Sequence, residues 1–146
     1  MNTSSTHGSQ AHPAILAFMA RRGMPMSELR SDGRLTLNFD QKYRVHVHSS
    51  THNRVALSAQ LMSLGARYHD AASDQALERL TALAAGMLQQ HASSLCLDER
   101  TKALLLQQTL PADASAANVE AALADFVNML PFWASACANQ ARLMAS

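Results

Sequence analysis

The chain has 146 residues, of which 48% are apolar, and this length and composition suit one domain with one hydrophobic core. The net charge is only +1 with the histidines neutral, so we expect neither a nucleic acid nor an anionic membrane surface as partner. No apolar run approaches the length of a bilayer span, so we also expect no membrane insertion.

Residues 1–12 are polar and lack the charged start and the apolar middle of a secretory signal. We interpret them as a flexible N-terminal tail, and residues 13–146 as a single domain of a cytoplasmic protein. Cys96 and Cys137 do not have the spacing of a metal or redox motif, so we expect two buried, reduced thiols.

The first predicted element is a short helix over residues 13–23. Pro13 suits the first helical position, and Gly23 suits the end of the helix. Three alternating runs follow, over residues 34–39, 43–48 and 54–61, with short polar turns between them. Alternation with period two predicts an antiparallel meander with one apolar face and one solvated face.

A second helix is predicted over residues 73–90, with Ser73 as its N-cap. Its apolar stripe consists of Leu77, Leu80, Ala84, Met87 and Leu88. Residues 93–97 and 102–110 then predict a second hairpin. The apolar run within the latter segment leaves a helix open as an alternative.

The last predicted helix starts at Ser115, which can cap it. Pro131 falls within its apolar pattern and should kink the helix or end its regular part. The fold class is therefore α+β, an antiparallel sheet with three helices in the order α-β-β-β-α-β-β-α.

Three histidines lie close together, at His46, His48 and His52. The first two project from one face of a strand, and the third could reach back from the following turn, so a metal site is geometrically conceivable. The first carboxylate after them is Asp70, however, and a solvated strand face explains the pattern more simply. A metal- or small-ligand-binding α+β protein, possibly an enzyme, therefore remains the alternative hypothesis.

Other chemistry has no support in the sequence. There is no phosphate-binding glycine loop and no nucleophile elbow, so we assign no catalytic residue, metal or cofactor and do not expect an enzyme. We expect the scattered histidines to lie at the surface; these are His7, His12, His69 and His91.

The order of elements resembles the class I type III secretion chaperones, the Tir chaperone family. The stretch that is similar to the first strand pair of the family is DGRLTLNFDQKYRVHVH. The second helix and hairpin are similar over ALERLTALAAGMLQQHASSLCLDERTKALLLQQTLP, and the last helix over NVEAALADFVNMLPFWASA. The resemblance covers roughly residues 13 to 140.

The resemblance implies a homodimer that works without catalysis or ATP. It implies that the dimer binds the N-terminal chaperone-binding segment of one or a few secreted effectors in extended form, keeping it soluble and competent for export. The implied effector-binding residues are Ile15, Phe18, Met19, Leu35, Leu37 and Phe39. The implied dimer contacts are Leu77, Leu80, Leu95 and Leu97. Core packing is the competing role for every one of them. An adaptor that binds folded partners is a third hypothesis.

Overall fold

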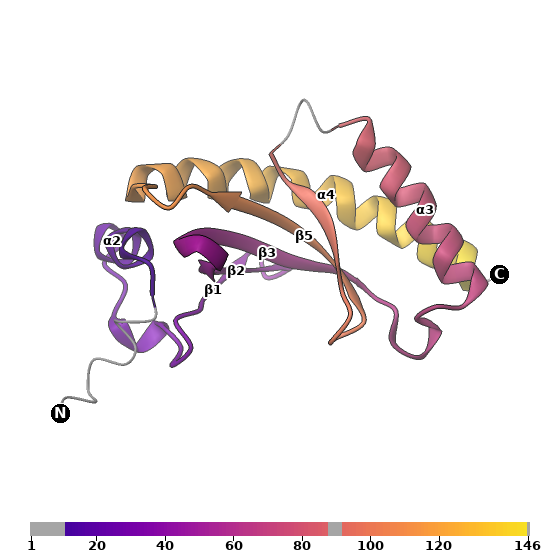
Figure 1. Ribbon diagram of the computed structural model, residues 1–146, viewed down its shortest axis with the longest axis horizontal. Coiled ribbons are helices and arrows are strands. Elements are labelled where there is room, and N and C mark those ends of the chain that lie inside the picture. The colour runs from indigo at the N-terminus through magenta and orange to yellow at the C-terminus, as the bar shows by residue number, and fades with distance from the viewer. Residues whose placement is uncertain (1–10, 88–91, 146) are drawn as a thin grey trace. The chain divides into compact units, whose positions relative to one another are not determined.

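The structure is a computed structural model that describes residues 11–87 and 92–145 (Figure 1). Its α-helices are α2 (Pro13–Arg21), α3 (Ala71–Ala85) and α4 (Ala116–Ala145). Its strands are β1 (Leu35–Phe39), β2 (Tyr43–Ser50), β3 (Arg54–Ser63), β4 (Ser94–Asp98) and β5 (Ala103–Leu110). Short 3₁₀ helices are η1 (Met26–Glu28), η2 (Thr51–Asn53) and η3 (Gly65–Arg67). The predicted order of helices and strands is confirmed.

The strands form a sheet in the order β1-β2-β3-β5-β4, and the register of its hairpins is antiparallel. The chain divides into two compact units. Unit 1 comprises the described residues up to Ser58 together with Gln108–Val127, and unit 2 comprises the described residues of Ala59–Gln107 and those from Asn128 onwards. The single domain over residues 13–146 stays a prediction.

The N-cap of α2 is His12, a residue predicted to lie in the flexible tail and at the surface. Its Nδ1 accepts the backbone N–H of Ala14 at 2.9 Å, and its Nε2 donates to the carbonyl of Ala112 at 2.7 Å. The side chain therefore joins two segments of unit 1 and is buried, so the surface assignment was wrong. Residues 1–10 of the predicted tail lie outside the described residues.

The hairpin of β1 and β2 follows the predicted alternation. Leu35 pairs with Val47 and Phe39 with Tyr43, and the turn between the strands places Asp40 and Gln41 at positive φ. The apolar face joins the buried residues of unit 1, which include Leu35, Val45, Val47, Val55, Leu57, Ile15, Phe18, Met19, Val119, Leu123 and Phe126.

The opposite face of the sheet is less solvated than predicted. In β3, Ala56 and Ser58 are buried as well as Val55 and Leu57, so burial in this strand does not alternate. His46 and His48 in β2 are half-buried, whereas Arg44 is exposed. The prediction of one wholly wet face was wrong for β3, since period two distinguishes the faces of a strand but not what covers each face.

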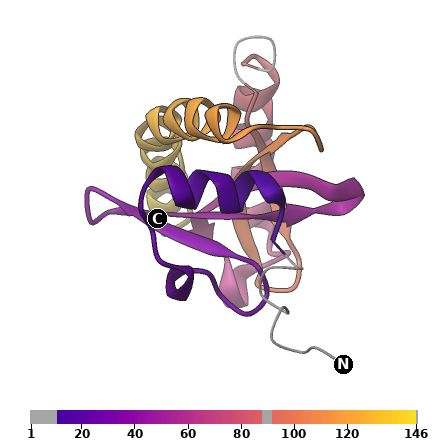
Figure 2. The ribbon, with the colours of Figure 1, turned by 90° about the vertical axis from the view of Figure 1, so that its left-hand side faces the viewer.

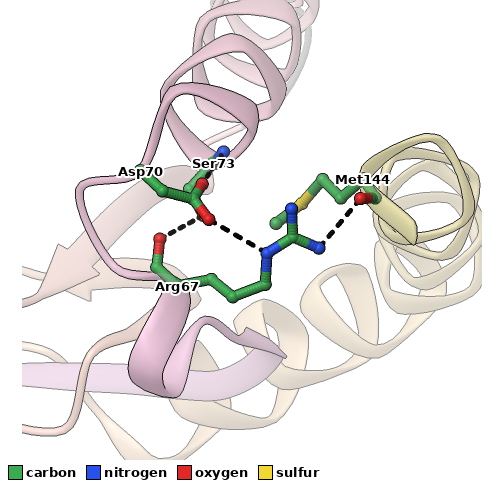
Figure 3. Close-up of polar contacts among 4 residues, drawn as sticks. All are labelled: Arg67, Asp70, Ser73 and Met144. Atoms are coloured by element: carbon green, nitrogen blue, oxygen red, sulfur yellow. Dashed lines mark hydrogen bonds and ion pairs between the residues drawn. The ribbon is translucent and has the colours of Figure 1, made fainter. Parts of the chain in front are cut away.

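In unit 2, α3 begins earlier than predicted because Asp70 caps it instead of Ser73 (Figure 3). Oδ1 of Asp70 accepts the backbone N–H of Ser73 at 2.7 Å, and the Ser73 hydroxyl donates to the carbonyl of Arg67 at 2.6 Å. Arg67 also donates from Nε to Asp70 at 3.0 Å and from Nη1 to the carbonyl of Met144 at 2.9 Å. These bonds connect the first turn of α3 to the end of α4.

The predicted extension of α3 to residue 90 is not observed as far as the chain is described. The helix ends at Ala85, and Gly86 is its C-cap. The predicted stripe residue Leu88 lies outside the described residues. The apolar run in residues 104–106 belongs to β5, so the helical alternative for this segment was wrong.

Helix α4 begins after Ser115, whose hydroxyl accepts the N–H of Asn118 at 3.2 Å, as predicted for an N-cap. The helix continues through Pro131 to Ala145, so it does not end at the proline, and the predicted kink stays a prediction. Buried side chains on both sides of Pro131, Phe126 and Trp133 among them, hold the helix together where one backbone hydrogen bond is missing.

Within the described residues, α4 is the one helix long and apolar enough to cross a membrane. It also buries a stripe at helical spacing, as an amphipathic helix packed on a core does. The stripe consists of Val119, Leu123, Phe126, Leu130, Trp133 and Cys137. The expectation of no membrane insertion stays a prediction.

Candidate functional site

The outer edge of β1 is the first part of the candidate site. β1 is the terminal strand of the sheet, and a single bridge from Leu29 to Leu35 covers the beginning of its outer edge. In the described chain, no strand pairs with that edge beyond this bridge. Unpaired N–H and C=O groups on an edge strand can hydrogen-bond to an added strand.

Apolar side chains accompany this free edge. Leu35, Leu37 and Phe39 lie on the same face of β1; Leu35 is fully buried, while Leu37 and Phe39 are half-buried. Met26 in the neighbouring η1 is 51% exposed. A row of apolar groups thus runs from the core of unit 1 to its surface, beside backbone that can accept another strand.

Three other predicted effector-binding residues lie in the core instead of beside the strand edge. Ile15, Phe18 and Met19 on α2 are at most 1% exposed and belong to the core of unit 1. A bound polypeptide could reach them only if α2 moved. Their role in binding stays a prediction. Met26 was missed, because a lone methionine after Pro25 gives no periodic signal.

Ion pairs connect α2 to the first turns of α4, beside which it lies (Figure 2). Glu120 accepts from Arg21 at 3.0 Å and from Arg22 at 3.4 Å. Arg22 also lies over the ring of Phe18, 5.2 Å from its centroid. All of these charged groups are partly exposed, so each pair contributes little alone. Together they hold α2 against the apolar core.

The histidines do not converge on a common point. The Thr36 hydroxyl and Nδ1 of His46 are hydrogen-bonded at 2.9 Å, and Nδ1 of His48 donates to the carbonyl of Ser49 at 3.1 Å. Burial, and then the charge of Arg34, hold the pKa of both rings below the ordinary histidine value. His52 lies in η2 with φ of 60°.

Within the ranges 11–87 and 92–145, no group of three histidine, cysteine or acidic residues could hold a metal ion. Neighbouring arginines would also repel a cation at His46 and His48. The alternative hypothesis of a metal centre therefore has no ligand set in the described chain.

The predicted dimer contacts lie in unit 2, where α3 lies beside β4 (Figure 1). Leu80 is buried, whereas Leu77, Leu95 and Leu97 are half-buried. β4 is the other terminal strand of the sheet. Leu83 on α3 is 41% exposed and was missed because it lies outside the predicted stripe.

Both cysteines are free, but only Cys137 is buried as predicted. Burial raises the pKa of its thiol to about 11, so it is unreactive near neutral pH. Cys96 in β4 is half-buried, so the prediction of full burial was wrong for this residue.

Residues 14–134 match the family model of the Tir chaperone protein (CesT) family. The chain belongs to this family. No match was found among curated proteins. The family is one of chaperones, and the free strand edge of β1 with its apolar side chains agrees with this membership.

Solved structures of similar fold extend the comparison. A chain in the crystal structure of the ExsC-ExsE complex is 22% identical with a TM-score of 0.61, over 92% of this chain and 96% of that chain. A chain in the HopA1-SchA chaperone-effector complex is 16% identical with a TM-score of 0.63, over 92% of this chain and 98% of that chain. A third structure is the complex of the Yersinia pestis type III secretion chaperone SycH with a fragment of YscM2. A chain in it is 14% identical with a TM-score of 0.55, over 84% of this chain and 98% of that chain. These similarities establish the fold as that of the secretion chaperones.

Proposed function

We propose that this protein is a cytoplasmic type III secretion chaperone. It binds the N-terminal chaperone-binding segment of a secreted effector in extended form and keeps it soluble and export-competent, without catalysis. Membership of the Tir chaperone family supports this function, as does the similarity in fold to a chain of the HopA1-SchA chaperone-effector complex and to a chain of the complex of the type III secretion chaperone SycH with YscM2.

The free edge of β1 is the observation that carries the proposal within this chain. An extended polypeptide can add to this edge through backbone hydrogen bonds and place apolar side chains beside Leu37 and Phe39. Backbone pairing tolerates many sequences, whereas the apolar row selects for hydrophobic positions in the client.

The experiment is limited proteolysis of the complex formed with secreted proteins of the same host. We expect one or a few of them to bind, each with a short N-terminal segment protected from the protease and the rest of the effector cleaved as in isolation. Protection of a folded domain in the partner instead would favour the adaptor hypothesis.

We also propose a homodimer through β4 and α3. Leu95 and Leu97 are half-buried on the edge strand β4, and Leu83 is exposed on the neighbouring helix α3; a second copy would cover these apolar side chains.

Replacing Leu97 with aspartate should convert the dimer to a monomer, because the interface would bury an unpaired carboxylate. Light scattering after gel filtration measures the change in mass. Asp113→Asn, which alters one exposed charge between β5 and α4, is the control and should stay dimeric. A Leu97→Asp variant that remains a dimer would contradict this interface.

A further inference from the structure

The polar face of the β1–β2 hairpin carries a concentration of cationic and imidazole groups. The register pairs Asn38 with Arg44 and Thr36 with His46, and it pairs His48 with Ala56 of β3. These residues therefore lie on the face opposite Leu35 and Val47. Arg34 precedes β1 and falls opposite His48 if the same register is extended by one residue. We call Arg34, Arg44, His46 and His48 the arginine–histidine face.

The charges at this face are predominantly positive. His46 experiences the positive charges of Arg34, Arg44 and Arg30, and also the neighbouring His48. The acidic group that acts on His48 is Asp32, together with the carbonyl of Ser49. Within the described chain, no carboxylate lies within ion-pair distance of Arg34 or Arg44. The chain is nearly neutral overall, so this local excess of positive charge distinguishes the face.

One donor on this face is desolvated without compensation. Nε of Arg34 is buried and has no hydrogen-bond partner among the described residues. A guanidinium N–H that has lost water without gaining an acceptor destabilises the isolated protein, and a carboxylate is the acceptor that matches guanidinium geometry best. The same group would stabilise a complex that supplies that acceptor.

We propose that the arginine–histidine face binds an acidic segment of the polypeptide cargo. The inference rests on the proposed function and adds the chemistry of the bound segment: carboxylate side chains that pair with Arg34 and Arg44 and lie near His46 and His48. The free edge of β1 borders this face, so one extended segment could present apolar residues to Leu37 and carboxylates to the polar side of the strand.

This arrangement couples binding of the acidic segment to protonation of His46 and His48. Burial and the adjacent arginines keep the pKa of His46 and His48 below the ordinary value, and bound carboxylates would raise it again. The complex then holds more protons than the separate partners, so its affinity should increase as the pH falls from about 8 to about 6.

The probe is a fluorescein-labelled peptide of alternating aspartate and valine, compared with its asparagine–valine counterpart by fluorescence anisotropy. We expect the aspartate peptide to bind more tightly at low salt and at the lower pH. Arg34→Gln/Arg44→Gln should weaken it about tenfold, since one ion pair at the half-buried Arg34 and one at the exposed Arg44 are lost. Arg100→Gln removes the same charge from an exposed turn in unit 2 and should have no effect.

Three results would overturn the inference. The first is equal binding of both peptides, and the second is a loss of affinity in Arg100→Gln as large as that in Arg34→Gln/Arg44→Gln. The third is binding of a single-stranded oligonucleotide in preference to the aspartate peptide. If the double variant unfolds, Arg44→Gln alone replaces it as the test variant, because it alters only an exposed side chain.

The same variants tested on an isolated effector complex separate the two proposals. If the complex forms and its affinity is unchanged by either variant and by pH, the acidic-segment inference fails while the chaperone function stands. If no effector binds even the unaltered protein, the chaperone function fails.

Discussion

Replacing both Leu37 and Phe39 with aspartate should weaken effector binding at least about a hundredfold, because full burial of each apolar side chain contributes roughly 1.5–3 kcal/mol. Both side chains are half-buried in the free protein and lie beside the unpaired edge of β1. The variant should keep the fold, since Leu35 anchors the strand in the core. Isothermal titration with the protease-protected effector segment measures the loss.

The matched control for this pair is Phe132→Asp, which places a carboxylate at an aromatic position of unit 2 that is 42% exposed. It should bind the effector segment normally. Unchanged affinity in Leu37→Asp/Phe39→Asp, with circular dichroism of a folded protein, would show that the edge of β1 is not the binding site.

Phe18→Ala should reduce the free energy of unfolding by about 3–5 kcal/mol, the usual cost of a cavity left by a core phenylalanine. The ring is only 1% exposed and packs in the core of unit 1, under the guanidinium of Arg22. Domains of this size are stable by about 5–15 kcal/mol, so this loss is a large fraction of the total. Urea unfolding followed by circular dichroism measures it.

Met26→Ala is the control, because its side chain is 51% exposed and its removal should change stability by less than about 0.5 kcal/mol. A Phe18→Ala protein of normal stability that fails to bind effector would reverse our interpretation. Phe18 would then be a contact residue, as the family resemblance implied, and α2 would have to open on binding.

The periodic spacing of apolar residues along the sequence was sufficient to predict most of the fold. Alternation defined β1 and β2 and the side of each that is buried, because a strand must present every second residue to the core. It could not show that Ala56 and Ser58 are also buried, since this depends on neighbouring elements and not on the strand itself.

Helix ends were harder to predict than helices. Asp70 and Ser73 are both good capping residues, and the choice between them depends on Arg67, which accepts from Ser73 and donates to Asp70. The continuation of helix α4 past Pro131 likewise depends on tertiary burial on both sides, which outweighs the local preference of proline.

The candidate site shows the same limit. Ile15 and Leu37 are equally apolar in sequence, yet the first is fully buried and the second borders a free strand edge. Only the order of strands in the sheet makes β1 an edge, and that order involves segments far apart in the chain. The orphaned Nε of Arg34 has no sequence signal at all.

Native mass spectrometry of the untagged protein isolated from its own host tests the central claim most directly, since it measures subunit number, bound protein and bound metal together. The chaperone function predicts two copies of this chain with one larger, metal-free protein. A single copy that carries a stoichiometric metal and no partner would contradict it, and His46, His48 and His52 would then be the first residues to replace.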